Sequence, residues 1–576
     1  MYSVVNEILN SKDAVEIDLV FYDVTQAYDS LWMEHSLLDL FNTGVKNNVI
    51  NLLHKLNKKA TIQIKTPVGI SDKMEIKDII MQGETISSIV CTTTVDKIDR
   101  DCKLPAYEYK SVVKIPKLSF VDDILDVTKC GEETIRMNNY TTEEINKRKL
   151  QFSKDKCVRL HVSSKKAIKQ KQNDSCKSVY IDEWKVEKEK NGSKIKLKDS
   201  HVGKAELKTV TSHLYLGDLV KSDGSNKDNV LAKAAKGRAV ARDIIHILNN
   251  LHLREFYFDA LKLMRESMLI SVLTNNLEVS LNMTASEIKI LDDVDLMLLR
   301  GAMQTSSKSS RCLLLLELGL VSVEFTIKKK RLGYLYELLT TDIPSLAKQI
   351  FDQQLQNPAR GDWINLVTKD LKDLNINLSF SEIVMLTKQK FKQTVKLACR
   401  ESCFKQLISD KQRLSKGKEI IYFKFETQNY FKPQSCLSTE TMRRIYHTRC
   451  REIYLKCNFP ASFGDNKCIS PCSVGQDNER HIYSCKYFSN QNELLIRNNS
   501  FEEIFENNVQ NQIDVVNILY SRLEVRKTFL NSASPDGVPL DPRGAGARAL
   551  PRLGIREAKQ KFAKINKRNK TRCIKK

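Results

Sequence analysis

Short apolar runs alternate with segments of helical spacing through the first 130 residues. The run at 19–22 predicts a buried strand that ends at Asp23. Residues 34–56 have the spacing of one or two helices, interrupted at Gly44. Residues 85–101 predict another helix. Strands and helices mixed in this way predict an α+β fold.

Two short apolar runs, at 118–121 and 124–127, are separated by two acidic residues. Runs this short, separated by so few residues, predict a tight β-hairpin. The pattern places Asp122 and Asp123 at the tip of that hairpin.

The remainder of the chain changes character several times. Residues 163–199 are rich in lysine and lack clear periodicity, which predicts a solvated insertion or loop. Residues 230–341 have strongly helical spacing, and residues after 531 are rich in Gly, Pro, Ala and Arg. The predicted division is 1–162 mixed sheet and helices, 163–229 lysine-rich insertion and its continuation, 230–345 and 346–451 helical, 452–530 a Cys/His module with a terminal helix, and 531–576 a basic, disordered tail.

Composition adds a preference for polyanions. The 576 residues are 41% hydrophobic and 28% charged, as in folded proteins, and 93 Lys and Arg against 70 Asp and Glu give a formal charge of +23. This excess favours nucleic acid or an anionic membrane surface as a partner. No apolar run could span a bilayer and no secretory signal is visible, so we expect no membrane association and a nuclear and cytoplasmic location.

The acidic residues at the predicted strand end and hairpin tip suggest nucleotidyl transfer. That reaction uses two divalent cations about 4 Å apart. Mg²⁺ binds hard carboxylate oxygens, completed by water and phosphate. Asp23, Asp122 and Asp123 could supply this site if the strand and the hairpin are neighbours. Each acid taken alone is more often structural.

The context of these acids resembles the reverse transcriptases of non-LTR (LINE-type) retrotransposons. The resemblance implies a reverse-transcriptase palm of mixed sheet and helices, followed by an all-α thumb and connector and a zinc-like Cys/His module. The matching segments, in family order, are Phe21-Tyr22-Asp23 to Leu31 for motif A, Gln82-Gly83-Glu84 for motif B, Phe120-Val121-Asp122-Asp123 for motif C, 152–156 for motif D, and Tyr215-Leu216-Gly217 after the palm.

The resemblance also implies an RNA template, a DNA primer and deoxynucleotides as partners, with two Mg²⁺ ions held by the three acids. Tyr28 would lie beneath the incoming sugar and exclude a ribose 2′-hydroxyl. Gln82 and Gly83 would let the backbone approach the nascent base pair. Lys156 would neutralise the leaving pyrophosphate. The basic helix at 328–332 would contact phosphates.

Only 22 residues precede Asp23, whereas the family has a fingers region there, so the expected member is N-terminally truncated. Glu84 also departs from the Asp frequent in motif B. These departures leave open a catalytically inactive, nucleic-acid-binding remnant of the same family. A basic scaffold that only binds RNA is a third reading.

A Cys/His cluster lies near the C-terminus, where related elements carry one. Four soft ligands at this spacing fit a tetrahedral, structural Zn²⁺ site. Four unconnected residues are the alternative, because the chain has 15 cysteines. The predicted ligands are Cys468, Cys472, His481 and Cys485, with Cys450 and Cys457 close upstream as substitutes.

Overall fold

The structure, a computed structural model, separates into two compact units that interleave along the chain. The first comprises Met1–Arg238, Ile270–Val294 and Val323–Cys399, and the second comprises Ala239–Leu269, Asp295–Ser322 and Arg400–Lys576. The structure describes all residues except 26, 59–60, 68, 76–85, 116, 170–177, 192–193, 252, 282, 415–418, 423, 454, 456, 459–466, 469–471, 473–474, 486–487, 489–499, 507 and 533–576, and except the side chains of 28–29, 57–58, 75, 185–191, 194–200 and 527–532.

A five-stranded mixed sheet organises the first unit, with the order β13-β10-β1-β9-β8. Its central strand β1 is buried along almost its whole length, as its continuous apolar sequence predicts. β1 pairs antiparallel with β9 and β10, β8 pairs antiparallel with β9, and β13 joins β10 in parallel. The strands are β1 (Glu16–Asp23), β8 (Lys117–Phe120), β9 (Asp123–Lys129), β10 (Val158–Ser163) and β13 (Lys208–Val210).

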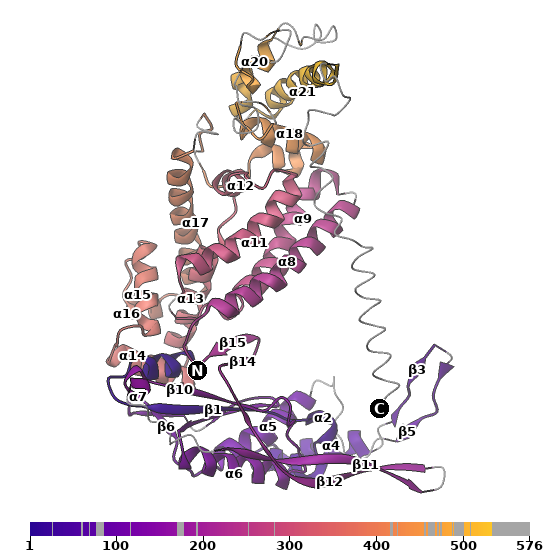
Figure 1. Ribbon diagram of the computed structural model, residues 1–576, viewed down its shortest axis with the longest axis vertical. Coiled ribbons are helices and arrows are strands. Elements are labelled where there is room, and N and C mark those ends of the chain that lie inside the picture. Colours follow the sequence, from indigo (N-terminus) through magenta and orange to yellow (C-terminus); the bar gives the residue numbers. More distant parts are fainter. Residues whose placement is uncertain are drawn as a thin grey trace. The chain divides into compact units, whose positions relative to one another are not determined.

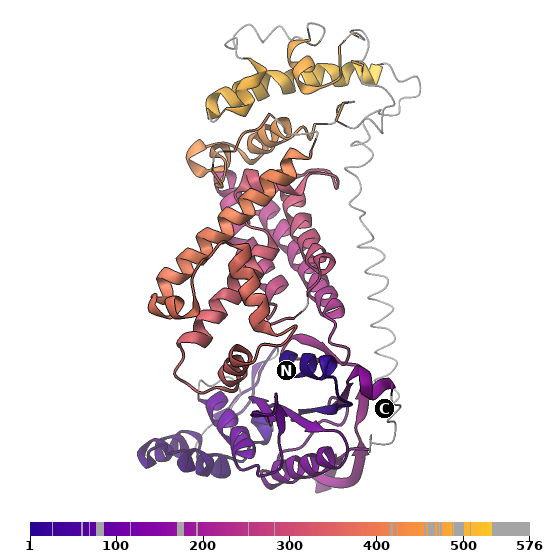
Figure 2. The ribbon, with the colours of Figure 1, turned by 90° about the vertical axis from the view of Figure 1, so that its left-hand side faces the viewer.

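Alternate residues of β1 enter two different cores, one on each face of the sheet. Leu19 and Phe21 pack with helix α1 (Tyr2–Asn10), whereas Val20 and Tyr22 pack with the helices of the other face. Figures 1 and 2 show α1 on one side of the sheet and α6 on the other. The helices of that second face are α3 (Met33–Asn42), α4 (Asn47–Lys58), α5 (Ser87–Arg100) and α6 (Glu132–Lys147). The mixed sheet with flanking helices confirms the α+β prediction.

Helices α3 and α4 are separated at Gly44, as the sequence predicts. Gly44 has φ +94°, a left-handed conformation that glycine adopts without a steric penalty. The small elements of the same region are α2 (Ala27–Ser30), β2 (Thr61–Ile62), β3 (Lys65–Thr66), β4 (Gly69–Ile70), β5 (Met74–Glu75), β6 (Tyr107–Tyr109) and β7 (Val113–Ile115).

Residues 163–199 differ from the predicted solvated loop. Beyond α7 (Lys165–Lys169), most of the described part is a long antiparallel hairpin of β11 (Tyr180–Asn191) and β12 (Lys194–Glu206), visible as a ribbon in Figure 1. Charged side chains obscured its strand signal, because a two-stranded ribbon need not alternate apolar and polar residues. A second, shorter hairpin follows, from β14 (Ser212–Tyr215) to β15 (Asp218–Lys221).

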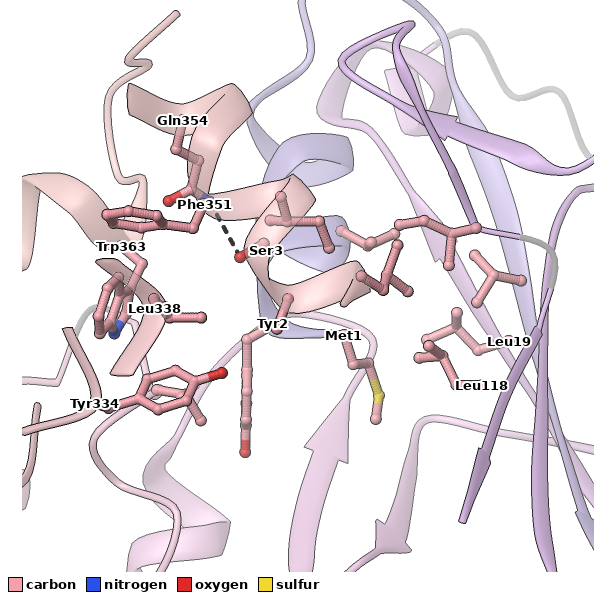
Figure 3. Close-up of a pocket in the computed structure, with 17 residues that line it drawn as sticks. Met1, Tyr2, Ser3, Leu19, Leu118, Tyr334, Leu338, Phe351, Gln354 and Trp363 are labelled. Carbon is pink, nitrogen blue, oxygen red and sulfur yellow. Dashed lines mark hydrogen bonds between the residues drawn. The ribbon is translucent and has the colours of Figure 1, made fainter. Parts of the chain in front are cut away.

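Helices from later in the chain complete the first unit. An apolar cavity of about 280 Å³ lies between α1, the sheet and these helices (Figure 3). At its edge, Gln354 Nε2 donates to Ser3 Oγ at 3.2 Å and to Tyr109 Oη at 3.0 Å. The helices are α10 (Ser271–Thr274), α13 (Val323–Thr340), α14 (Leu346–Gln356), α15 (Trp363–Asp373) and α16 (Phe380–Met385), while α8 (Lys227–Asn250), α11 (Ala285–Met303) and α17 (Lys388–Gln412) have residues in both units.

A buried carboxylate organises the core of the second unit, which is helical in its described part. The Glu317 side chain is fully buried and accepts hydrogen bonds from Tyr422 Oη at 2.6 Å and Tyr430 Oη at 2.5 Å, beside Arg449. None of the helices that the structure describes is both long and apolar enough to span a membrane. The helices are α9 (Tyr257–Met264), the π-helix Arg265–Ile270, α12 (Arg311–Leu318), α18 (Thr439–Arg449), α20 (Glu479–Ser484), α21 (Val509–Ser532) and short 3-10 turns at Arg254–Phe256, Asn429–Phe431, Pro433–Ser435 and Phe501–Phe505.

A buried ion pair links β8 and β9 in the first unit. Lys117 and Asp126 are cross-strand partners, their side chains are 0% and 1% exposed, and Nζ lies 2.5 Å from Oδ1. Tyr22 Oη and Thr141 Oγ1 donate to the other oxygen of Asp126, at 3.1 and 2.9 Å. The carboxylate is therefore compensated on both oxygens.

We expect Lys117→Met to lower the free energy of unfolding by about 3–5 kcal/mol, because it leaves the Asp126 carboxylate buried without its cation. Urea denaturation followed by circular dichroism measures this loss. Lys117→Met combined with Asp126→Asn should recover most of it, since the neutral amide oxygen still accepts from Tyr22 and Thr141. A double variant no more stable than the single one would contradict this account.

Candidate functional site

Two of the predicted acids are direct neighbours across the sheet. Asp23 ends β1, Asp123 begins β9, and the antiparallel register pairs their Cα atoms. Cα atoms of such partners lie roughly 4.5–5.5 Å apart, so both carboxylates extend from one edge of the sheet. They stand on the face that also carries Phe21 and Leu125, following the alternation of side chains along each strand.

The turn between β8 and β9 carries the third acid. Phe120 pairs with Asp123, which leaves Val121 and Asp122 as the two-residue loop of the hairpin. The sequence predicted that Asp122 and Asp123 lie at the tip. In the structure the tip is Val121-Asp122, and Asp123 belongs to strand β9. Val121 has φ +58°, which a β-branched residue adopts only at a cost of about 1–3 kcal/mol.

Lys156 contacts the strand-end acid. Its Nζ lies 3.1 Å from Asp23 Oδ1 and 3.0 Å from Oδ2. The segment before β10 brings it there, because Ser153 N donates to Asp23 O at 2.9 Å and Phe152 bridges to Val24. The hydrogen bond to Asp23 raises the pKa of Lys156, so this lysine is charged.

The electrostatics of the acid cluster oppose full ionisation. Burial raises the pKa of Asp123, and the carboxylates of Asp122 and Asp23 raise it further, while Lys156 acts in the opposite direction. Carboxylates this close repel one another. A cation placed among them would relieve the repulsion, and carboxylate oxygens are the ligands that hard divalent ions such as Mg²⁺ prefer. In the described part of the chain, however, these three acids are not among the groups whose donor atoms all lie within 4.8 Å of one another.

Three aromatic side chains that pack together near the acids were not predicted as a group from the sequence. The ring of Phe21 lies 4.5 Å from His213 and 5.3 Å from Tyr215, centroid to centroid. Burial lowers the pKa of His213, and the charge of Asp23 partly offsets that effect. His213 and Tyr215 are alternate residues of β14, so the predicted Tyr215-Leu216-Gly217 segment held the signal that could have identified His213.

The two turn residues of the hairpin formed by β14 and β15 have left-handed backbones. Leu216 has φ +49° and Gly217 has φ +84°, as in the turns that favour a two-residue β-hairpin. The segment singled out from the sequence is therefore the turn between β14 and β15.

Three other predicted residues are not located by side-chain geometry. Tyr28 lies in α2, but its side chain is outside the described part of the chain. Gln82 and Gly83 also lie outside the described residues. Their roles remain predictions.

The four predicted zinc ligands meet in the second unit. The donor atoms of Cys468, Cys472, His481 and Cys485 all lie within 4.8 Å of one another. Tetrahedral ligands about 2.3 Å from Zn²⁺ are about 3.8 Å apart, so the cluster has the size that the ion requires. Burial, with Cys472 and Cys485 nearby, raises the pKa of Cys468 to about 12. A bound metal would have to displace the thiol protons.

The backbone around the cluster fixes the position of His481. Its N–H donates to Oδ1 of Asn478, the N-cap of α20, at 2.9 Å. A Cβ added to Gly475 would lie 2.1 Å from His481 Cε1, so only glycine leaves room for the ring there. Cys468 N donates to Gly475 O at 2.6 Å and closes the loop.

Comparisons with known proteins bear on the first unit. Residues 8–198, about a third of the chain, match the family described as "Reverse transcriptase (RNA-dependent DNA polymerase)". This segment contains Asp23, Asp122, Asp123 and Lys156. No curated protein sequence is significantly similar to the chain.

Among solved structures, telomerase from Candida tropicalis in complex with the TWJ fragment of telomeric RNA is similar at 12% identity and a TM-score of 0.31, over 71% of this chain and 51% of that one. The apo telomerase of the same organism is similar at 13% identity and a TM-score of 0.27, over 69% of this chain and 55% of that one. The chain spans about half the length of these telomerase chains.

We expect the purified chain to contain about one equivalent of zinc by inductively coupled plasma mass spectrometry, because four soft donors converge. Cys472→Ala combined with His481→Ala should abolish it, whereas Cys436→Ala, which changes an exposed cysteine outside the cluster, should not. Gly475→Ala should also reduce zinc content, since its Cβ would displace His481. Equal zinc in the double variant and the parent would refute the assignment.

Proposed function

We propose that this chain is an RNA-directed DNA polymerase, which extends a primer 3′ end with deoxynucleotides on an RNA template. The observation that carries the proposal is the register pairing of Asp23 with Asp123, beside Asp122, inside the segment that matches the reverse-transcriptase family. Nucleotidyl transfer needs carboxylates from two elements, and this register supports the proposal because it brings the ends of two strands that carry acids to one edge of the sheet.

Asp23 and Asp122 would be the main ligands of two Mg²⁺ ions, with Asp123 as the third carboxylate. When bound, such ions lower the pKa of an attacking hydroxyl and neutralise developing phosphate charge. Lys156 reaches Asp23 with a charged ammonium and would also approach the departing pyrophosphate. Its 67% exposed side chain can turn from one role to the other.

The type of element is a finer proposal. We infer a non-LTR retrotransposon polymerase from the order of the five motifs, the Tyr215–Gly217 turn and the downstream Cys/His cluster. The alternative is a catalytically inactive, nucleic-acid-binding relative, which the departure at Glu84 from the usual motif B favours. Nuclear and cytoplasmic location remains part of the same proposal.

Primer extension on poly(rA)/oligo(dT) with Mg²⁺ separates these readings. We expect incorporation by the parent chain and a loss of at least about a thousandfold in Asp122→Asn, Asp123→Asn, because removing carboxylate ligands forfeits several kcal/mol of metal-dependent stabilisation. Asn is nearly isosteric with Asp, so folding should be retained.

The matched control is Asp72→Asn, Asp101→Asn, which changes the charge equally at two exposed positions. Its incorporation should equal that of the parent. A parent chain that binds template and primer without any incorporation would establish the inactive alternative. Equal incorporation by the two double variants would remove the acid cluster from the mechanism.

Tyr28→Val should relax sugar selection, because a smaller side chain five residues after Asp23 would admit a 2′-hydroxyl. We expect the ratio of kcat/KM for GTP to that for dGTP on an RNA template to rise by about tenfold or more. An unchanged ratio, with extension by dGTP intact, would show that Tyr28 has another role.

A further inference from the structure

A groove of about 500 Å³ lies between helices α13 and α17 of the first unit. Lysines project from both helices at its walls, and a tyrosine and a buried phenylalanine line it. The residues that line it are Glu278, Lys329, Lys330, Gly333, Tyr334, Glu337, Phe391, Lys392, Val395 and Lys396.

Internal ion pairs divide the lysines of this region into two groups. Two charges of the predicted phosphate-binding segment at 328–332 are neutralised within the protein. Lys328 pairs with Asp373 at 3.0 Å, and Arg331 pairs with Asp370 at 2.5 Å. Lys329, Lys392 and Lys396 are exposed and form no ion pair with any residue that the structure describes. Their charge remains available to an external anion.

Gly333 is one of the residues that line the groove. It lies inside α13, where glycine costs roughly 1 kcal/mol relative to alanine. A Cβ added there would meet nothing within 4 Å, so no neighbour in the fold requires the glycine. By contrast, a Cβ at Gly237 or Gly301, in other helices, would lie within 2.5 Å of a leucine or isoleucine side chain. A helical glycine facing open space is suited to the close approach of a ligand.

Tyr334, Phe391 and Glu278 also line the groove. The ring of Tyr334 is held edge-on by Trp363, 5.7 Å away between centroids, and Phe391 is packed against Tyr336. Glu278 Oε2 is buried and has no hydrogen-bond partner among the described residues. An unsatisfied buried carboxylate oxygen is costly unless a ligand supplies a donor.

We propose that this groove binds a single strand of RNA. The three available lysines would contact phosphates and Tyr334 would support a base. The Glu278 side chain would turn its buried oxygen toward the groove and accept a hydrogen bond from a ribose 2′-hydroxyl. A volume of about 500 Å³ suits a ligand of one or two nucleotides. The site is separate from the acid cluster and does not depend on the proposed polymerase activity.

Fluorescence anisotropy with labelled single-stranded RNA, without Mg²⁺, tests the site on the full chain. We expect Lys392→Glu, Lys396→Glu to weaken binding at least tenfold at about 100 mM salt. The slope of log affinity against log salt should fall by about 1.4, because two phosphate contacts are lost at roughly 0.7 each.

The matched control is Lys369→Glu, Lys372→Glu, which makes the same charge change at exposed positions on α15. It should have less than a threefold effect. Equal losses in the two double variants would overturn the proposal in favour of general attraction to a basic protein. A loss confined to duplex RNA would overturn it as well.

Gly333→Leu provides a test without a change of charge. The leucine fills open space and favours the helix, so the thermal midpoint should not fall, yet single-stranded RNA binding should weaken at least fivefold. Unchanged binding would overturn the assignment of the groove.

Glu278→Leu tests RNA selectivity. The ratio of affinity for RNA to affinity for DNA of the same sequence should fall about tenfold, since a hydrogen bond to a charged group is lost. An unchanged ratio would contradict the 2′-hydroxyl contact. Asp122→Asn, Asp123→Asn should bind single-stranded RNA like the parent, so failure of the groove and failure of the polymerase proposal give different results.

Discussion

The antiparallel register of β1 against β9 is the constraint on which the candidate site depends. It opposes Asp23 to Asp123, and a shift of one residue would turn one carboxylate to the other face of the sheet. A buried hydrogen bond between the two strands opposes such a shift. Tyr22 Oη of β1 donates to Asp126 Oδ2 of β9 at 3.1 Å, and the other oxygen of Asp126 is paired with Lys117 of β8. Another register of β1 against β9 would take the Tyr22 hydroxyl away from this buried carboxylate.

The site itself combines features that work against stability. The carboxylates of Asp23 and Asp122 act electrostatically on Asp123, the pKa of Asp123 is raised by burial and by these acidic neighbours, and Val121 has a left-handed backbone. Interactions around the site compensate, including Lys156 on Asp23 and the buried strands below it. Strain and like charges that the fold tolerates at one point are typical of places where a protein binds cations or performs chemistry.

Local sequence signals were sufficient for the elements that hold the acids. The apolar run ending at Asp23, the break at Gly44 and the hairpin around Asp122 depend on residues close in sequence, and the structure has all three. Non-local features were not predictable in this way. No local pattern specifies that β13 joins β10 in parallel, or that α14 and α15 return to the first unit. The charged hairpin of β11 and β12 was missed because both of its strands lack apolar alternation.

Net charge is likewise evident from the sequence, but the surface that uses this charge is evident only from the structure. A formal charge of +23 favours a polyanionic partner but assigns it to no surface. The basic run at 328–332 looked like the best contact, yet helical geometry turns Lys328 and Arg331 toward acids of α15. Lys329 differs from these neighbours because it forms no ion pair with any of the described acidic residues. Phosphate affinity in a basic protein therefore depends on which cations the fold leaves unpaired, and this requires the packing of helices far apart in sequence.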